Sequence, residues 1–393
     1  MMHCPAVAWP PIPWASLFDP MFIWAILALV VGAGLLILSR LRHSVIGCSL
    51  GSQHHFAISW SLLDFILILI VFQFLAQGVV SAFEKIGLSI AAMPTEQQVV
   101  AISCQVAEKC STQAALYLQP ITGPVWLGAE LLPQQLLTQL DEQLRLQPVR
   151  MRWLLLGNVL SAGLMIALTL LYMRVRTENH LYQMGWHAHR WLAQLHLAYL
   201  AWFAVTPMVF LVLLMATSWH SIIGKPTPHV ADQLMQVSPS WASWVIIFIA
   251  AIVAAPVWEE VLMRGLLQPI LTHEPIWADS MVILGMLTAV AIAFQEGSSM
   301  GPMLFLLTVG PGYVLFDRFS RPWLPHPGAA RGIFATSLFF ASMHFSAWPS
   351  PIPLFFLSLA LGYVSYRAQS LLAPIAFHAL FNLVSLVQSL PLR

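Results

Sequence analysis

Charged residues are scarce in this chain. Asp, Glu, Lys and Arg make up only 8% of its 393 residues, about a third of the share that soluble domains carry. The formal net charge is +1, so the chain has neither the basic field that attracts nucleic acid nor an acidic tail. These deficits exclude a soluble globular domain, and they predict no nucleic-acid partner.

Cysteine is also scarce, and the spacing of the cysteines does not match that of a zinc site. The four cysteines are Cys4, Cys48, Cys104 and Cys110, and no CxxC pair occurs among them. Zinc sites built from cysteine pairs are therefore excluded. Cys104 and Cys110 can bridge if their loop is extracytoplasmic, and two free thiols are the alternative that stays open. The HExxH motif of zinc proteases is missing as well.

Apolar residues are abundant instead. They account for 59% of the chain, the mean hydropathy is +0.78, and several apolar runs are long enough to cross a bilayer. We therefore expect an all-α fold, a polytopic transmembrane helix bundle of about ten spans, with no cleavable signal peptide. The predicted spans are Met21–Ser39, Ile58–Val80, Trp153–Met173, Trp191–Ser218, Trp241–Leu271, Ile276–Phe294, Met303–Phe316, Arg331–Phe345, Ile352–Tyr366 and Leu372–Leu390.

The spans divide the chain into two regions. Residues 1–152 should hold two N-terminal spans and a long extramembrane loop. Within this loop one leucine-rich stretch has the periodicity of an amphipathic surface helix. Residues 153–393 should form a membrane-embedded catalytic bundle, with a two-span insertion at about residues 273–330. The leucines of the amphipathic stretch are Leu132, Leu136, Leu137, Leu140 and Leu144.

Basic residues predict the orientation, because loops rich in Lys and Arg stay in the cytoplasm. If the loop after the first span is cytoplasmic, that side of the membrane collects most of the arginines that lie outside the long loop. Both termini are then outside, and the end of the span that follows Glu259 faces the cytoplasm. We expect an integral, multi-pass protein of the plasma or inner membrane.

Two adjacent glutamates interrupt the fifth predicted span. Glu259 and Glu260 follow a long apolar run, and Arg264 comes four residues after Glu260. Ionisable side chains persist at such depth mainly where they face a protein interior or a watery cavity. Glu260 and Arg264 share one helical face, in the favourable acid-before-base order, whereas Glu259 is rotated by about 100° from Glu260. Paired carboxylates at this place predict a catalytic site.

Two further motifs lie on later spans. Phe340 and His344 form an FxxxH motif, and His378 and Asn382 form an HxxxN motif. Residues four apart share a helical face, so His378 and Asn382 can point at one spot. Glu259 and His344 lie at similar distances from the ends of their spans, and an antiparallel pairing of these helices would bring both to the same depth.

The motifs EExxxR, FxxxH and HxxxN, in this order on apolar helices, resemble those of the CPBP (Abi-like) family. This family comprises CAAX proteases, among them the type II CAAX prenyl endopeptidases, and bacteriocin-processing enzymes. The resemblance covers about Trp241–Leu390. It implies an intramembrane endopeptidase that acts on a membrane-associated protein or peptide, which for a CAAX-type substrate is prenylated.

The resemblance also implies a role for each motif residue. Glu259 would be the general base that activates a water, and His344 would hold that water. His378 and Asn382 would donate hydrogen bonds to the oxyanion of the tetrahedral intermediate. The supporting ion pair is formed by Glu260 and Arg264.

Alternatives remain open at this point. Glu259, His344 and His378 are also a possible ligand set for zinc with one open position. We expect catalysis without a cofactor, because the role of His378 as an oxyanion donor requires an unmetallated ring. Two other kinds of function are alternatives to an enzyme. The first is a non-enzymatic membrane scaffold or immunity factor, and the second is a transporter. The oligomeric state is left open.

Overall fold

Among the residues that the computed structural model describes, every regular element is a helix, as the sequence predicts. The described residues are 60–85, 134–176, 184–186, 191–218, 241–296, 300–344, 347 and 349–388. The predicted first span, Met21–Ser39, and all four cysteines lie outside them. The chain divides into two compact units. One comprises Met1–Ile26 and Val80–Leu154, and the other comprises Leu27–Val79 and Leu155–Arg393. All motif residues belong to the second unit.

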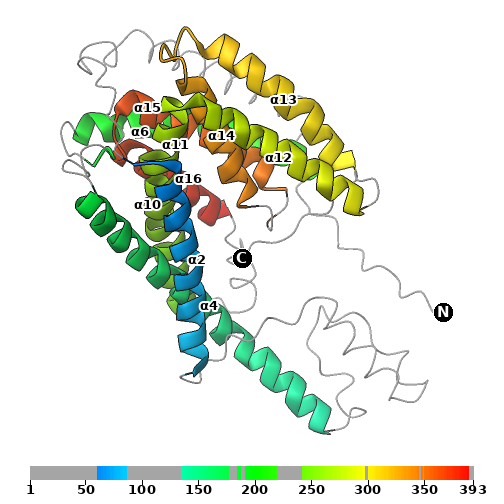
Figure 1. Ribbon diagram of the computed structural model, residues 1–393. Coiled ribbons are helices and arrows are strands. Elements are labelled where there is room, and N and C mark those ends of the chain that lie inside the picture. Colours follow the sequence, from blue (N-terminus) through cyan, green and yellow to red (C-terminus); the bar gives the residue numbers. More distant parts are fainter. Residues whose placement is uncertain are drawn as a thin grey trace. The chain divides into compact units, whose positions relative to one another are not determined.

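Figure 1 shows the helices in chain order from blue to red. They are α2 (Leu62–Lys85), α4 (Gln134–Arg176), α6 (Trp191–Ser218), α9 (Trp241–Phe248), η5 (Ile249–Ala254), α10 (Ala255–Glu260), η6 (Val261–Leu267), α11 (Gln268–His273), α12 (Pro275–Glu296), α13 (Met300–Ser320), α14 (Ala329–Ser342), α15 (Pro351–Ala368) and α16 (Leu372–Gln388). Helix α4 includes both the third predicted span and most of the stretch predicted as an amphipathic helix.

Four of the described helical stretches are long and apolar enough to cross a membrane. They are Leu62–Val79, Leu155–Val175, Trp191–Ser218 and Ser243–His273. Shorter apolar helical stretches occupy Pro275–Thr288 and Leu372–Val387. The protein is thus an integral membrane protein, whereas the predicted total of ten spans is not confirmed. Helices stand at every predicted span after the first, although α14 ends at Ser342, three residues before its predicted end.

Five elements, α9 to α11, follow one another without a break from Trp241 to His273. This confirms the predicted long helix, but two stretches of it, η5 and η6, have π-helical geometry that the sequence analysis did not predict. Each π stretch ends shortly before a proline, Pro256 or Pro269. Proline lacks an N–H group and its ring clashes with the carbonyl four residues back, so a local change of helical register accommodates it. The two glutamates lie on α10, between the two π stretches.

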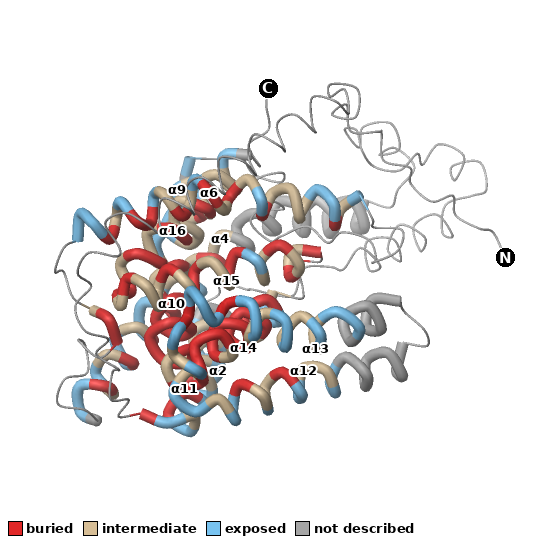
Figure 2. The backbone as a smooth tube through the Cα atoms, turned by 90° about the horizontal axis from the view of Figure 1, so that it is seen from above, coloured by how far each residue is buried: buried red, intermediate tan, exposed pale blue. Residues whose placement is uncertain are grey.

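The core of the second unit surrounds this long helix. All seven residues of η6 are buried, and α14 is buried along most of its length. In Figure 2 the buried residues concentrate on α10, α11, α14 and α15, while α9, α12 and α13 show exposed faces. Helix α14 packs on α11, α12, α13 and α15, and α6 packs on α15 and α16. The motif-bearing helices are therefore the central ones.

Small residues allow α14 to approach α11 closely. A Cβ atom on Gly332 would lie 2.5 Å from Oγ1 and 2.7 Å from the backbone N of Thr272. A Cβ atom on Gly328 would lie only 1.9 Å from the Thr272 carbonyl oxygen. Because no side chain fits in these gaps, glycine at both positions fixes the distance between the FxxxH helix and the helix that carries the glutamates.

Helix α2 is tied to its neighbours by polar side chains. Asp64 accepts hydrogen bonds from the Tyr172 hydroxyl and from the backbone and hydroxyl of Ser61. The indole of Trp60 donates to the carbonyl oxygen of Leu266 in η6 at 3.2 Å. Helix α2, which begins two residues after Trp60, is thereby attached to the π stretch beside the glutamates.

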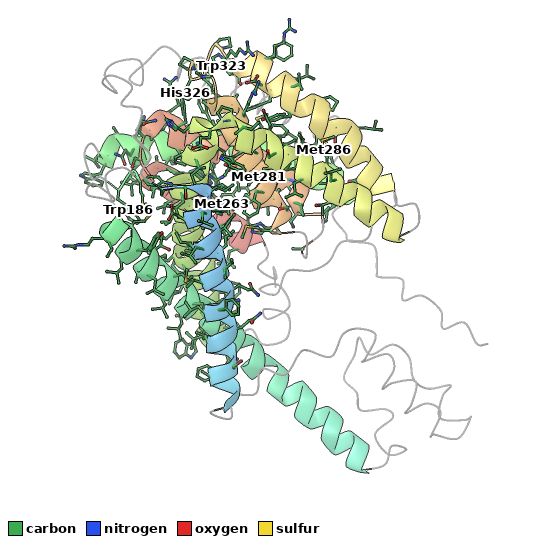
Figure 3. All side chains as sticks on the ribbon, viewed as in Figure 1. Trp186, Met263, Met281, Met286, Trp323 and His326 are labelled. Atoms are coloured by element: carbon green, nitrogen blue, oxygen red, sulfur yellow. The ribbon has the colours of Figure 1, made fainter. Side chains whose placement is uncertain are left out.

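Helices α12 and α13 are joined to α14 by charged and apolar contacts. Arg331 on α14 bonds Asp279 on α12 at 3.1 Å and Asp317 on α13 at 3.5 Å. Figure 3 labels Met281 and Met286 along α12, and both pack against the main apolar cluster. This hairpin covers the outer side of α14.

Candidate active site

Glu260 is the centre of the polar cluster. Its side chain is completely buried, and its Oε1 atom lies 3.0 Å from Nη1 of Arg264 and 2.8 Å from Nδ1 of His378. The Arg264 contact is local, within one helix, while His378 comes from α16. An ionised carboxylate only accepts hydrogen bonds, so the Nδ1 atom of His378 carries a proton toward Glu260. The second ring nitrogen, Nε2, is left on the opposite side of the ring.

Glu259 lies on that opposite side. Its Oε2 atom is 3.8 Å from Nε2 of His378, and its side chain keeps 19% of its surface exposed. Their rotation of about 100° around the helix allows Glu259 to face elsewhere than Glu260. The two carboxylates do differ in burial, but both lie beside the same imidazole ring. Glu259 is thus the more exposed carboxylate of the pair.

Arg264 is held from two sides. Its Nη2 atom donates to the hydroxyl of Ser358 at 2.7 Å and to the carbonyl oxygen of the same residue at 3.1 Å. Its guanidinium lies 5.2 Å from the centre of the Phe340 ring. One turn further along the helix, Gln268 donates to the carbonyl oxygen of Gly362 at 3.0 Å. Two polar contacts therefore fix α15 against the glutamate helix.

The ring of Phe340 connects the first two motifs with the third. Its centre lies 4.8 Å from that of the His344 ring and 5.9 Å from that of the His378 ring. The residue is almost fully buried. An aromatic ring with partners on several sides has little freedom to turn, so Phe340 fixes the relative positions of both histidines and Arg264.

His344 follows the last turn of α14 and is half-buried. Its Nδ1 atom lies 2.9 Å from the carbonyl oxygen of Phe340. Because a carbonyl oxygen only accepts, Nδ1 carries the proton. The Nε2 atom of the neutral ring is then an acceptor, which suits it to hold a water molecule.

Asn382 lies one turn beyond His378 on α16. Its Nδ2 atom donates to the carbonyl oxygen of Ala251 in η5 at 2.7 Å. The side-chain amide has two N–H groups, and this bond uses one of them. Asn382 is thereby fastened to the same long helix that carries both glutamates.

The possible zinc ligands do not gather in one place. Glu259 and His378 are close to each other, but within the described part of the chain no three His, Cys, Asp or Glu side chains lie where they could hold one metal ion. His378 also directs Nδ1 at Glu260 rather than outward. The described residues therefore do not fit the three-ligand zinc site that the sequence left open.

A family model fits the part of the chain that contains this cluster. The model describes Rce1-like type II CAAX prenyl endopeptidases, and it matches residues 241–316 and 313–384. The two segments include all seven motif residues and every side chain around Glu260 named above. Residues 241–384 are thus similar to this family. No curated protein and no solved structure matches the chain.

Similarity to the Rce1-like family indicates an endopeptidase of the CAAX protease type. The matched segments together span less than half of the chain. They begin at the first residue of α9 and end within α16. The helices α2, α4 and α6 lie outside the match, yet α6 packs on α15 and α16, so it supports the family region from one side.

Sequence reasoning missed several residues of the cluster. Ser358 and Gly362 sit in an ordinary apolar stretch, and nothing in their sequence surroundings marks them. Phe340 is different: it is the first residue of the FxxxH motif, and its fixed spacing from His344 signals a packing role. The contact of His378 with Glu260 was not predicted either, since the sequence analysis assigned these two residues to separate functions.

Proposed function

We propose that the chain hydrolyses a peptide bond in a membrane-associated protein or peptide, including a prenylated CAAX-type substrate, with Glu259 as the general base. One observation carries the proposal. Of the two adjacent carboxylates, Glu260 is fully buried in an ion pair, and Glu259 remains partly exposed beside His378. A general base must reach water and substrate, and Glu259 is the carboxylate that can do so.

The chemical step follows from these positions. Glu259 takes a proton from a water molecule while the water oxygen attacks the carbonyl carbon of the peptide bond. His344 orients that water through Nε2, because Nδ1 is occupied by the Phe340 carbonyl oxygen. The carbon–nitrogen bond then breaks, and Glu259 returns the proton to the departing amine.

Two side chains would stabilise the oxyanion. Asn382 offers its second amide N–H, since Ala251 accepts the first. His378 can donate from Nε2 only when both ring nitrogens are protonated, because Nδ1–H is held by Glu260. Such prearranged donors typically contribute a few kcal/mol to lowering the barrier.

Catalysis without metal is part of the proposal. It is supported by the His378–Glu260 hydrogen bond and by the failure of Glu259, His344 and His378 to form a common ligand group within the described residues. The proposal also names the side of the membrane to which the site opens and the partners of the protein. We propose a site that opens toward the cytoplasm, the lipid bilayer as surroundings, and no nucleic-acid partner.

The test is Glu259→Gln, with Glu274→Gln as the control. Glu274 is an exposed glutamate at the junction of α11 and α12, so its replacement makes the same chemical change away from the cluster. The assay follows cleavage of a quenched farnesylated CAAX peptide by purified protein in lipid nanodiscs. Glu259→Gln should abolish cleavage with an unchanged unfolding temperature, and Glu274→Gln should cleave normally. Full activity of Glu259→Gln would disprove the assignment of the base, and an inactive parent protein would disprove the CAAX-type substrate.

A further inference from the structure

The glutamate helix contains a carbonyl group that lacks its regular backbone donor. At the end of η5, the N–H of Ala255 donates to the carbonyl oxygen of Ala250, five residues back. The same register, one position on, would bring the N–H of residue 256 to the carbonyl oxygen of Ala251. Residue 256 is proline, which has no N–H. The sequence thus removes the donor that the π-helical register requires for Ala251.

Asn382 supplies the missing donor. Its Nδ2 atom lies 2.7 Å from the Ala251 carbonyl oxygen, and the two residues are 131 positions apart in the sequence. A backbone carbonyl within a membrane helix bundle has no water to bond and must be satisfied by protein. The bond is therefore a firm attachment for the Asn382 side chain. The carboxamide is planar, so fixing one N–H also fixes the direction of the other.

We propose that Pro256 is a positioning residue for hydrolysis. Because Pro256 has no N–H to donate to Ala251, this carbonyl oxygen is available to orient the amide of Asn382. The inference rests on the proposed function, in which Asn382 donates its second N–H to the oxyanion. It adds that the proline three residues before Glu259 sets the geometry of a donor on a different helix.

Three variants separate the missing N–H from the rigid ring. Pro256→Ala supplies the N–H, whereas Pro256→lactic acid, the α-hydroxy acid analogue of alanine, lacks both the ring and the N–H. Pro311→Ala removes a proline from the interior of α13 at an exposed position and serves as the control. All three are made in the full chain and measured with the farnesylated peptide in nanodiscs.

The expected pattern is a lower kcat with a nearly unchanged KM. Pro256→Ala should lower kcat roughly 10- to 100-fold, as small misplacements of catalytic groups do, while KM stays nearly constant because the donor acts in the transition state. Pro256→lactic acid should retain most of the parent kcat, and Pro311→Ala all of it. Equal losses in both Pro256 variants would assign the effect to the ring and overturn the proposal.

A stability measurement tests the attachment independently of activity. Asn382→Ala should lower the apparent Tm of the parent much more than that of Pro256→Ala, where the backbone already satisfies Ala251. Equal losses in both backgrounds would overturn the proposal. If Pro256→Ala does not fold, the lactic acid variant decides: the full loss from Asn382→Ala supports the proposal, and no loss overturns it. Should the Tm pattern hold while Asn382→Ala keeps the parent kcat, the proposed oxyanion role itself is wrong, and the positioning role falls with it.

Discussion

Arg264→Ala should destabilise the protein and remove its activity together. The guanidinium makes a 3.0 Å ion pair with Glu260, and the side chains of both residues have no exposed surface. It also donates two hydrogen bonds to Ser358 and covers the ring of Phe340. The variant leaves Glu260 as a buried carboxylate with His378 as its remaining partner, and it frees the Ser358 hydroxyl.

The expected magnitude follows from this burial. Removing one partner of a buried ion pair costs roughly 3–5 kcal/mol, because the other charge stays in a medium of low polarity. The unit that contains the pair comprises Leu27–Val79 and Leu155–Arg393, and for a domain of about 290 residues this corresponds to a fall of roughly 5–8 °C in the unfolding temperature. Activity should fall as well, because Glu260 loses one of the two contacts that fix its carboxylate beside His378. A second change, Glu260→Gln, should recover part of the lost stability by neutralising the stranded charge.

Arg321→Ala is the matched control. Arg321 forms an i,i+4 pair with Asp317 at 3.3 Å, but its side chain is 70% exposed, and exposed pairs contribute only about 0–1 kcal/mol. The assay is thermal unfolding of purified protein in nanodiscs, followed by tryptophan fluorescence, together with peptide cleavage. If Arg264→Ala unfolds at the same temperature as Arg321→Ala, the buried pair does not stabilise the fold. A stable but inactive Arg264→Ala would instead show that Arg264 contacts the substrate.

Three further predictions concern mechanism, topology and packing. Chelator-treated enzyme should keep its activity, and Asn382→Ala should lower kcat by roughly 10²–10³; zinc that is lost and regained together with activity would contradict the metal-free proposal. Cysteines introduced at Arg321 and Arg367 should react with impermeant thiol reagents only after cells are permeabilised. Labelling of both in intact cells would show that the topology is the reverse of the predicted one. Gly332→Ala should destabilise by about 1–3 kcal/mol because its Cβ meets Thr272, whereas Gly312→Ala, with its nearest neighbouring atom 3.9 Å away, should not; equal Tm values for the two would contradict the close packing.

The helical class and the element positions could be predicted because the sequence expresses them locally. Apolar runs define the membrane helices, and the i,i+4 spacing of Glu260 and Arg264 defines their ion pair without any tertiary information. Tyr172, which donates a hydrogen bond to Asp64 on α2, lies 108 positions away in the sequence, so no local pattern identifies this pair. Local patterns indicate which side chains need partners but do not identify distant ones.

The relation between His378 and the two glutamates could not be derived in the same way. It depends on the helical register at η5 and η6, and a change of register rotates every following side chain. The prolines Pro256 and Pro269 are visible in the sequence, but a proline is equally compatible with a simple kink. The position of Glu259 beside the same ring as Glu260 therefore required the three-dimensional structure.

The Glu260–Arg264 pair also has a consequence for how the protein is made. At about 5–20 residues per second, the ribosome needs some 6–24 s to add the 118 residues that separate Glu260 from His378. During this interval the nascent helix already lies in or near the bilayer, where a lone charge opposes insertion by about 2.5–3.5 kcal/mol. Arg264 follows within one turn, so the helix enters the membrane with its acid already compensated. Arg264 thus compensates the charge of Glu260 until His378 is synthesised. The hydrolytic centre is completed only when α16 has been synthesised and His378 binds Glu260.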